Sequence, residues 1–344
     1  MDEKRALVLF YDHKDRERQV RAGATLEAEV RRGFEGTGIA CDIHTASPQH
    51  EGWLVRAYLN AAKYDVVISA GGLSCSLDLA RMCMEELYDS ETIHISPRDW
   101  KGVKVKREEG KLILKEYADQ TITIEKTESS RYFKQERPVP IIGLPTSDDL
   151  TDGVVAFSSM VMSGRPSSAA CVGVDQGYAA GQLIAKMLNN SWNGIQFVVH
   201  QMHGHAYDLG CSAVALLNQE FKAYDDGKIP FEICTPPELR KNTLPVVFYE
   251  NFNDLRAVAR KEPFIIGVHV PSGRLNFTEF VKNTHGIENV IHTRPGVGEN
   301  AAMFAVQCLY FRHPKLKPSR FVDLRRARSL PHVQEYLELT NSVE

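Results

Sequence analysis

Three groups of residues in this chain have types and spacing that chemistry could use. His200, His203 and His205 fall within six residues and form the densest histidine cluster. The imidazole group suits proton transfer near neutral pH, and it also ligates zinc. No H-E-x-x-H pattern or partner cysteine pair accompanies the cluster. Three interpretations therefore stay open: a phosphate or proton-transfer site, a plain loop, and a metal site.

A polar turn and a glycine-rich loop are the other two groups. The turn, residues 11–15, reads Tyr-Asp-His-Lys-Asp, and the loop, residues 70–76, reads Ala-Gly-Gly-Leu-Ser-Cys-Ser. Backbone N–H groups of such a loop can bind an anion at a helix N-terminus. The loop matches neither the Walker pattern nor G-x-G-x-x-G, so a tight turn is an equally good interpretation.

The turn and the loop each follow a short apolar run that is typical of a buried strand. Such runs occur at residues 6–10, 39–43, 65–69, 141–144 and 169–174. Between them lie helix-like segments, such as the one that places Leu26, Val30 and Phe34 four residues apart. Alternating strands and helices, with glycines at the strand ends, predict a parallel α/β sheet. Ligands of open parallel sheets bind at the C-terminal ends of the strands, where the turn and the loop fall.

The pattern recurs in the second part of the chain. The triplet Ile-Ile-Gly occurs at 141–143 and at 265–267, and a glycine opens a small-residue helix at 177 and at 298. The offsets, 124 and 121 residues, are nearly constant, which predicts an internal duplication. Two ordinary α/β segments that look alike are the alternative. We expect one copy in residues 1–190 and a divergent copy in 191–344.

Residues 88–138 interrupt the alternation of predicted strands and helices in the first copy. The segments Val-Lys-Val at 103–105 and Leu-Ile-Leu at 112–114 flank a charged turn, which predicts a β-hairpin, and residues 121–124 predict a further strand. We interpret this segment as a β-rich insertion, with a solvated charged excursion as the alternative. The tail, residues 318–344, is charged and is expected to be helical.

Composition restricts the function classes. The chain has 344 residues, 43% of them hydrophobic and 25% charged, which allows a packed core. Its net charge of -3 gives no support for nucleic-acid binding. Seven cysteines without a C-x-x-C pattern fit reduced thiols in the cytoplasm. The first residues lack a signal-peptide pattern, and no apolar stretch is long enough to span a membrane.

Several of these segments resemble the PurE-type aminoimidazole ribonucleotide carboxylase/mutase family. The matching segments are I-I-G-L-P at 141–145, M-S-G-R-P at 162–166, C-V-G-V at 171–174 and G-Y-A-A at 177–180. That family has a G-V-P strand, an M-P-x-G-x-P turn and an A-I-G-x-x-G-A-x-N-A helix start at similar spacing. The segment V-V-I-S-A-G-G at 66–72 is similar to its V-I-I-A-G-A-G-G strand and loop. The resemblance covers most of residues 5–188 except the insertion, and covers 195–315 more faintly.

The resemblance implies a three-layer α/β/α sandwich with a parallel, flavodoxin-like sheet, here duplicated in tandem. It implies a small-molecule nucleotide substrate and no metal or organic cofactor. Family members usually form octamers, so a homo-oligomer of four tandem chains would build the same shell.

The resemblance also assigns roles to individual residues. It implies that Asp15 holds the ribose, that His50 shuttles a proton, and that the loop of Gly71 and Gly72 binds phosphate. The family motif S-A-H-R-T-P is replaced by Ala-Ser-Pro-Gln-His at 46–50, and Cys75 stands where a histidine is expected. The candidate catalytic residues are His50, Cys75 and His203. The candidate substrate-binding and phosphate-binding residues are Asp12, His13, Lys14, Asp15, Ser47, Gly71, Gly72, Ser74, Ser76, His200, His205 and Arg294.

Three functional hypotheses follow from these residues. The first is a PurE-like enzyme that carboxylates, decarboxylates or moves a carboxyl group on an aminoimidazole ribonucleotide, as in purine biosynthesis. The second is a catalytically altered relative that binds a nucleotide for regulation or as a scaffold. The third is a histidine-cluster metalloenzyme on the same fold.

Overall fold

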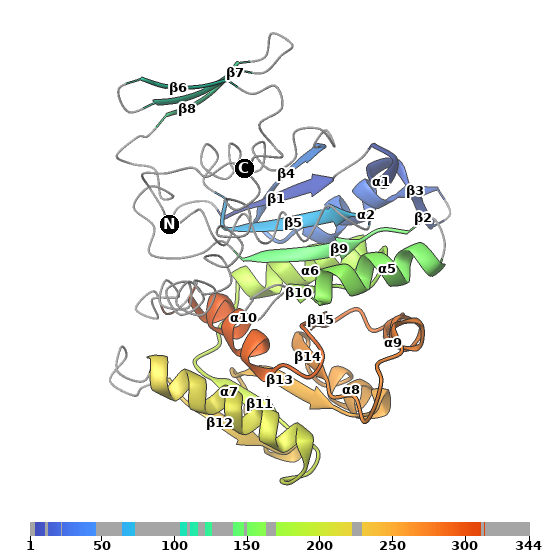
Figure 1. Ribbon diagram of the computed structural model, residues 1–344, viewed down its shortest axis with the longest axis vertical. Coiled ribbons are helices and arrows are strands. Elements are labelled where there is room, and N and C mark those ends of the chain that lie inside the picture. Colours follow the sequence, from blue (N-terminus) through green and yellow to red (C-terminus); the bar gives the residue numbers. More distant parts are fainter. Residues whose placement is uncertain are drawn as a thin grey trace, which may run out of the picture.

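A single ten-stranded sheet runs through the protein in a computed structural model, from β4 at one end to β12 at the other (Figure 1). The structure describes residues 4–10, 13–21, 23–45, 64–72, 104–108, 111–115, 121–125, 140–147, 150–162, 170–221, 229–310 and 313. In spatial order the strands are β12 (Phe231–Cys234), β11 (Ile195–Val198), β13 (Leu244–Tyr249), β14 (Ile265–His269), β15 (Val290–His292), β10 (Ala170–Cys171), β9 (Ile141–Pro145), β5 (Val66–Gly71), β1 (Arg5–Phe10) and β4 (Ala40–Thr45).

The sheet consists of two halves that meet at β10 and β15. We call β1, β4, β5, β9 and β10 the first half of the sheet, and β11 to β15 the second half. Numbered along the chain, the strands of each half follow the spatial order 2-1-3-4-5, which is flavodoxin-like. All pairs within a half are parallel, whereas β10 and β15 are antiparallel, with Cys171 opposite His292. The C-terminal strand ends of the two halves therefore lie at opposite edges of the sheet.

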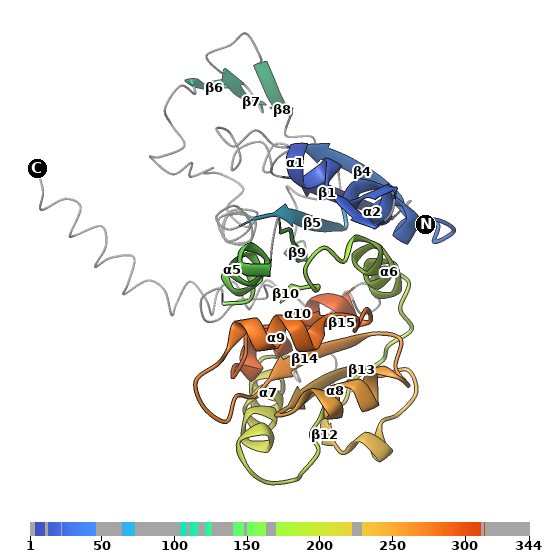
Figure 2. The same cartoon turned by 90° about the vertical axis from the view of Figure 1, so that its right-hand side faces the viewer.

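Helices cover both faces of the sheet. On one face, α2 (Leu26–Phe34), α6 (Gly177–Leu188), α7 (His205–Phe221) and α10 (Gly298–Tyr310) share a hydrophobic core. On the other face, α5 (Leu150–Val161), α8 (Phe252–Ala259) and α9 (Phe277–Thr284) enclose a second core. Figure 2 shows α5 and α6 on opposite sides of β9.

The alternation of side chains along the strands explains the two cores. In β13, Val246 and Phe248 belong to the first core, and Val247 and Tyr249 belong to the second. The remaining helical segments of the described residues are α1 (His13–Glu17) and the 3-10 helix η3 (Pro236–Glu238). Among the described helices, none has the length and apolar character that crossing a bilayer requires.

Glycines let the helices of the first face approach each other closely. A Cβ atom added to Gly177, at the start of α6, would lie 3.0 Å from the carbonyl oxygen of Leu26 in α2. A Cβ atom added to Gly298, at the start of α10, would lie 2.5 Å from the carbonyl oxygen of Leu209 in α7. The two glycines that the repeat pattern pairs thus occupy the same place in their halves.

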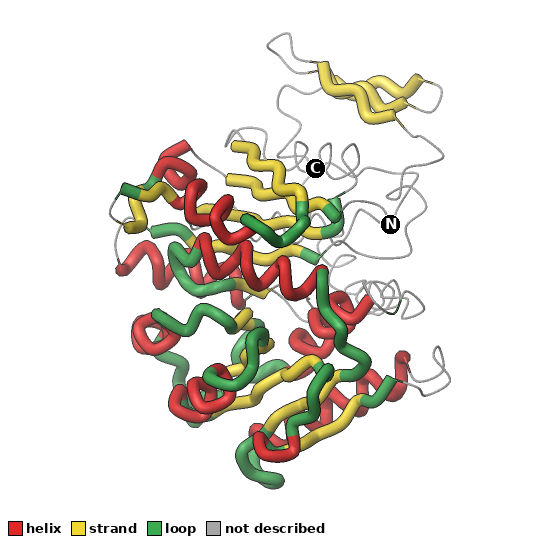
Figure 3. Tube along the Cα trace, turned by 180° about the vertical axis from the view of Figure 1, so that it is seen from behind, coloured by secondary structure: helices red, strands yellow, loops and turns green. Residues whose placement is uncertain are grey.

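Two smaller sheets lie outside the central one. The strands β6 (Lys104–Glu108), β7 (Lys111–Lys115) and β8 (Thr121–Glu125) form an antiparallel sheet, drawn apart from the central sheet in Figure 3. The hairpin and the third strand predicted for the insertion are therefore confirmed. The strands β2 (Gln19–Arg21) and β3 (Ala24–Thr25) form a hairpin that the sequence patterns did not predict.

The predicted mostly parallel α/β class is confirmed, with one difference in architecture. We expected a separate sandwich for each copy, but both halves contribute to one sheet. The edge strands β10 and β15 have only two and three residues. Because each would otherwise leave unpaired backbone groups at a sheet edge, pairing them satisfies both. The predicted helical tail, residues 318–344, lies outside the described residues.

Candidate functional site

Four side chains meet at the C-terminal strand ends of the first half. Thr146 Oγ1 donates a hydrogen bond to Asp15 Oδ1 over 2.5 Å. Arg18 Nη2 lies 3.7 Å from Asp15 Oδ1, and Arg18 Nε lies 3.8 Å from Asp175 Oδ1. We call Asp15, Arg18, Thr146 and Asp175 the Asp15 cluster. Its arginine is only 12% exposed, so solvent screens these charges less than it would at an open surface.

The parallel sheet brings these residues together from distant parts of the chain. Asp15 lies on α1 after β1, Thr146 follows β9, and Asp175 follows β10. Backbone bonds fix the strand ends: Thr146 N donates to Gly71 O over 3.1 Å, and Asp175 N donates to Pro145 O over 2.9 Å. Asp175 has a φ of 55°, a left-handed conformation that aspartate tolerates better than most residues. The β10–α6 turn therefore holds this carboxylate at the cluster.

A pocket of about 480 Å³ opens beside the Asp15 cluster. The first half of the chain supplies most of its wall, from β2, α2, the start of α5 and the β10–α6 turn. The second half supplies the rest, from the end of α9 and the segment before β15. The lining residues are Gln19, Val20, Glu29, Ser147, Gly153, Val174, Asp175, Gln176, Gly177, Tyr178, Ala179, Val281, His285, Gly286 and Glu288. A volume of this size suits a small-molecule ligand.

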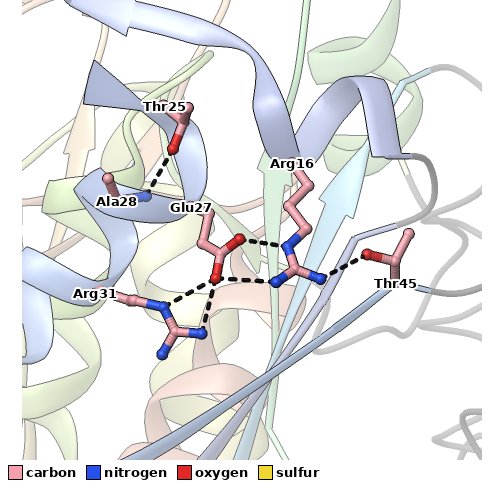
Figure 4. Close-up of polar contacts among 6 residues, drawn as sticks. All are labelled: Arg16, Thr25, Glu27, Ala28, Arg31 and Thr45. Carbon is pink, nitrogen blue, oxygen red and sulfur yellow. Dashed lines mark hydrogen bonds and ion pairs between the residues drawn. The ribbon is translucent and has the colours of Figure 1, made fainter. Parts of the chain in front are cut away.

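A separate charge network occupies Arg16, the residue next to Asp15. Arg16 pairs with Glu27 through both Nε and Nη2, and its Nη1 donates to Thr45 Oγ1 over 3.3 Å (Figure 4). Arg31 Nε adds a third donor to Glu27, over 2.9 Å. These hydrogen bonds, with that from Arg16 the strongest, lower the pKa of Glu27 although burial opposes the change. Arg16 is thus occupied by a carboxylate and has little remaining capacity for a ligand phosphate.

The C-terminal strand ends of the second half, which correspond to those that carry the Asp15 cluster, are filled with aromatic rings. In strand register Tyr249 pairs with His269, as Gly71 pairs with Pro145 in the first half. The His269 ring stacks on Phe252 at 5.4 Å and 14°, and its centroid is 5.3 Å from that of Tyr249. Tyr249 and His269 are 1% and 9% exposed. A large side chain thus stands where the first half has a glycine.

Buried polar atoms accumulate at this edge. Within the described part of the chain, Tyr249 Oη, His269 Nδ1 and both ring nitrogens of His292 are buried without a hydrogen-bond partner. Burial lowers the pKa of His269 to about 4, although a hydrogen bond with the Glu250 backbone opposes the change. Burial, together with the neighbouring His269, lowers the pKa of His292 to about 3. Both imidazoles are therefore neutral at physiological pH.

The histidine cluster follows β11 at the same edge. His203 and His205 are exposed, and His200 Nδ1 lies 3.7 Å from Asp254 Oδ1 of α8. Among the described residues, no group of three or more His, Cys, Asp or Glu side chains has an arrangement that could hold a metal ion. The geometry of these histidines consequently adds nothing to the metal interpretation.

The structure describes some of the other candidate residues from the sequence and not the rest. His13 and Lys14 are exposed on α1 beside Asp15, and Gly71 ends β5, next to Gly72. Arg294 Nη1 donates to Met162 O over 3.3 Å, at the junction of the halves. The remaining candidates lie outside the described residues: Asp12, Ser47, His50, Ser74, Cys75 and Ser76.

Sequence reasoning missed Arg18, Thr146 and Asp175, as well as the buried His269 and His292. For Asp175 a signal was available, because it opens a glycine turn after a predicted strand. Thr146 has no signal of its own, because only the folded sheet brings it to Asp15. Arg18 lies three residues after Asp15, so a local ion pair was the signal for it. Comparisons with protein-family models, curated proteins and solved structures gave no match to this chain.

Proposed function

We propose that the chain is a tandem PurE-like enzyme whose working site lies at the first half of the sheet. Its substrate is an aminoimidazole ribonucleotide or a related nucleotide, and the reaction is a cofactor-free carboxylation, decarboxylation or carboxyl migration. The observation that supports this most is the Asp15 cluster beside its pocket. The proposal includes a cytoplasmic homo-oligomer of four tandem chains.

Duplication of one ancestral unit is part of the proposal, and backbone contacts support it. Val172 N donates to Gly143 O over 3.0 Å, and Thr293 N donates to Gly267 O over 3.1 Å. The residue offsets of these two bonds are those of the sequence repeat. At the next turn, Gly296 has a φ of 67° where the first half has Asp175. The two halves also have the same spatial order of strands, which supports duplication as well.

The Asp15 cluster has the chemistry of a ribose site. A carboxylate can accept hydrogen bonds from both hydroxyl groups of a ribose ring. Thr146 and Arg18 hold that carboxylate in one orientation. The exposed His13 and Lys14 offer positive charge nearby for the 5′-phosphate.

The reaction needs only a proton donor and acceptor. In decarboxylation, the bond between the ring carbon and the carboxyl carbon breaks, and carbon dioxide leaves without the bonding electron pair. The pair stays on the ring carbon, which then takes a proton, so no oxidant or reductant is consumed. A histidine suits this role near neutral pH, and we assign it to His50, with Cys75, which stands where the family has a histidine, as the second candidate.

The second half is a poor place for the same chemistry. Its strand ends are occupied by Tyr249, Phe252 and His269, which pack against one another. This packing favours an arrangement in which the first half carries the catalytic site and the strand ends of the second half have a structural role.

A decarboxylation assay with carboxyaminoimidazole ribonucleotide, followed by absorbance, tests the proposal. We expect turnover by the wild type and a loss of at least about 100-fold in kcat for His50→Ala. Asp15→Asn should raise KM about tenfold, because it weakens a charged hydrogen bond to the ribose. His203→Ala should change little, and melting temperatures serve as the control for folding.

Nucleotide binding without turnover is the second candidate function. The replacement of S-A-H-R-T-P by Ala-Ser-Pro-Gln-His at 46–50 and the filled edge of the second half favour it. Absence of turnover, with ribonucleotide binding that Asp15→Asn weakens, would select this candidate. Absence of binding would reject both.

A further inference from the structure

The segment between α9 and β15 belongs to the second half but lines the pocket of the first. His285, Gly286 and Glu288 contribute to the same pocket wall as Gln19, Ser147 and Asp175 of the first half. The pocket is therefore incomplete without the second half of the chain.

The fold holds this segment in place. α9 ends at His285, whose N–H donates to Val281 O over 3.1 Å, and Gly286 follows with a φ of 83°. A glycine in the left-handed conformation is a common way to end a helix. Ile287 N then donates to Thr284 O over 3.0 Å, and the Asn289 side chain donates to Ala259 O over 2.6 Å. His285 and Glu288 thus remain exposed toward the pocket while the backbone between them is fixed.

The charges of the pocket indicate which part of a nucleotide it suits. Among the described lining residues the ionisable groups are Glu29, Asp175, Glu288, His285 and Tyr178, with no lysine or arginine. Glu29 is paired with Arg32 over 2.7 Å, and Asp175 lies 3.8 Å from Arg18. Because the described wall contributes carboxylates and no lysine or arginine of its own, it disfavours phosphate and favours a group that donates N–H bonds.

We infer that the second half of the chain recognises the heterocyclic base of the nucleotide, through His285 and Glu288. This inference rests on the proposed function, in which the Asp15 cluster holds the ribose. Arg18 lies close to both Asp15 and Asp175, and Asp175 lines the pocket. A base attached to a ribose at Asp15 would therefore extend into the pocket. The Glu288 carboxylate accepts from the amino group of an aminoimidazole, and the His285 ring contacts its other polar edge.

Binding of two probes to the full-length protein tests the inference. The first probe is aminoimidazole ribonucleotide, and the second is ribose 5-phosphate, which lacks the base. We expect His285→Ala and Glu288→Gln each to raise the Kd of the ribonucleotide about tenfold. Both should leave the Kd of ribose 5-phosphate within about twofold. Asp15→Asn should weaken both probes.

Matched variants on the same helix serve as controls. Lys282→Ala and Glu279→Gln alter exposed residues of α9 that do not line the pocket, so both should bind the two probes as the wild type does. Wild-type affinity of His285→Ala and Glu288→Gln for the ribonucleotide would overturn the inference and leave the proposed function standing. An equal loss for both probes would also overturn it, because the residues would then act through the fold. A wild type that binds neither probe would reject the proposed function itself.

Discussion

Two imidazole rings at the junction of the sheet must stay neutral in the folded protein. His292 is 1% exposed and lies opposite Cys171, and its ring centroid is 5.5 Å from that of Phe280. His269 is held by Phe252 and Tyr249. Protonation of either ring would place a charge among aromatic side chains, which costs several kcal/mol unless the structure opens.

Acid should therefore destabilise the protein well above the range in which carboxylates titrate. Folding lowers the pKa of His269 to about 4 and that of His292 to about 3, from an ordinary value of about 6.5. Between these values the unfolded chain binds more protons, so stability is complete above about pH 6.5 and falls as pH falls toward 4. We expect a loss on the order of 2 kcal/mol per histidine at pH 5, measured by urea denaturation at pH 7 and pH 5.

His292→Phe should remove about half of this pH dependence. Phenylalanine keeps an aromatic ring, somewhat larger than imidazole, and leaves no unpaired buried nitrogen, so stability at pH 7 should change little. His203→Ala, at an exposed site, should keep the wild-type pH dependence. An unchanged loss between pH 7 and 5 in His292→Phe would contradict the assignment.

At the scale of elements, close helix packing depends on glycines at two helix starts. The α6 helix approaches α2 through Gly177 and Gly181, whose added Cβ atoms would lie 3.0 Å from Leu26 O and 2.8 Å from Gly33 C. The α10 helix approaches α7 through Gly298. Backbone atoms cannot move aside as the end of a side chain can, so these contacts set the distance between the helices.

Gly298→Ala should lower the free energy of unfolding by about 1–3 kcal/mol, because its methyl group would overlap the Leu209 carbonyl oxygen. Gly210→Ala, inside α7, is the matched control. There the nearest atom to the added Cβ is 3.6 Å away, an ordinary contact. The control should be stabilising by about 0.5–1 kcal/mol, since alanine favours helix. Denaturant titration measures both, and equal effects would show that helix propensity rather than packing decides.

The whole molecule is organised as one sheet rather than as two joined units. Pairing of β10 with β15 makes the sheet continuous, and Phe157 of α5 packs against Phe280 of α9 with ring centroids 5.2 Å apart. The core on the α2 and α10 side likewise includes residues of both halves. A sheet and cores that cross the junction resist separation of the halves.

We therefore expect one cooperative unfolding transition for both halves. Far-ultraviolet circular dichroism and hydrogen exchange of β5 and of β13 should give the same midpoint in urea. Halves that unfold separately would give two transitions, with one group of strands exchanging first. Residues 1–190 expressed alone should fail to fold stably, because the β10 edge and Phe157 would lose their partners.

Local patterns were sufficient for the elements of this fold. Apolar runs placed the strands of the first half, the spacing of Leu26, Val30 and Phe34 placed α2, and the charged turn near residue 108 placed the hairpin of β6 and β7. These features depend on residues close in the chain, so periodicity and turn chemistry report them directly. The recurrence of Ile-Ile-Gly and of the later glycines also indicated two segments with one plan.

Only the tertiary structure decided which residues meet. Asp15 was a candidate on sequence grounds and Arg18 is its near neighbour in the chain, but Thr146 and Asp175 come from two other strand ends. The pairing of Cys171 with His292, and the position of His285 and Glu288 over the first half's pocket, depend on the antiparallel junction of the two half-sheets. Such contacts join residues more than a hundred positions apart, and no local pattern encodes them because their energy arises only when the sheet closes.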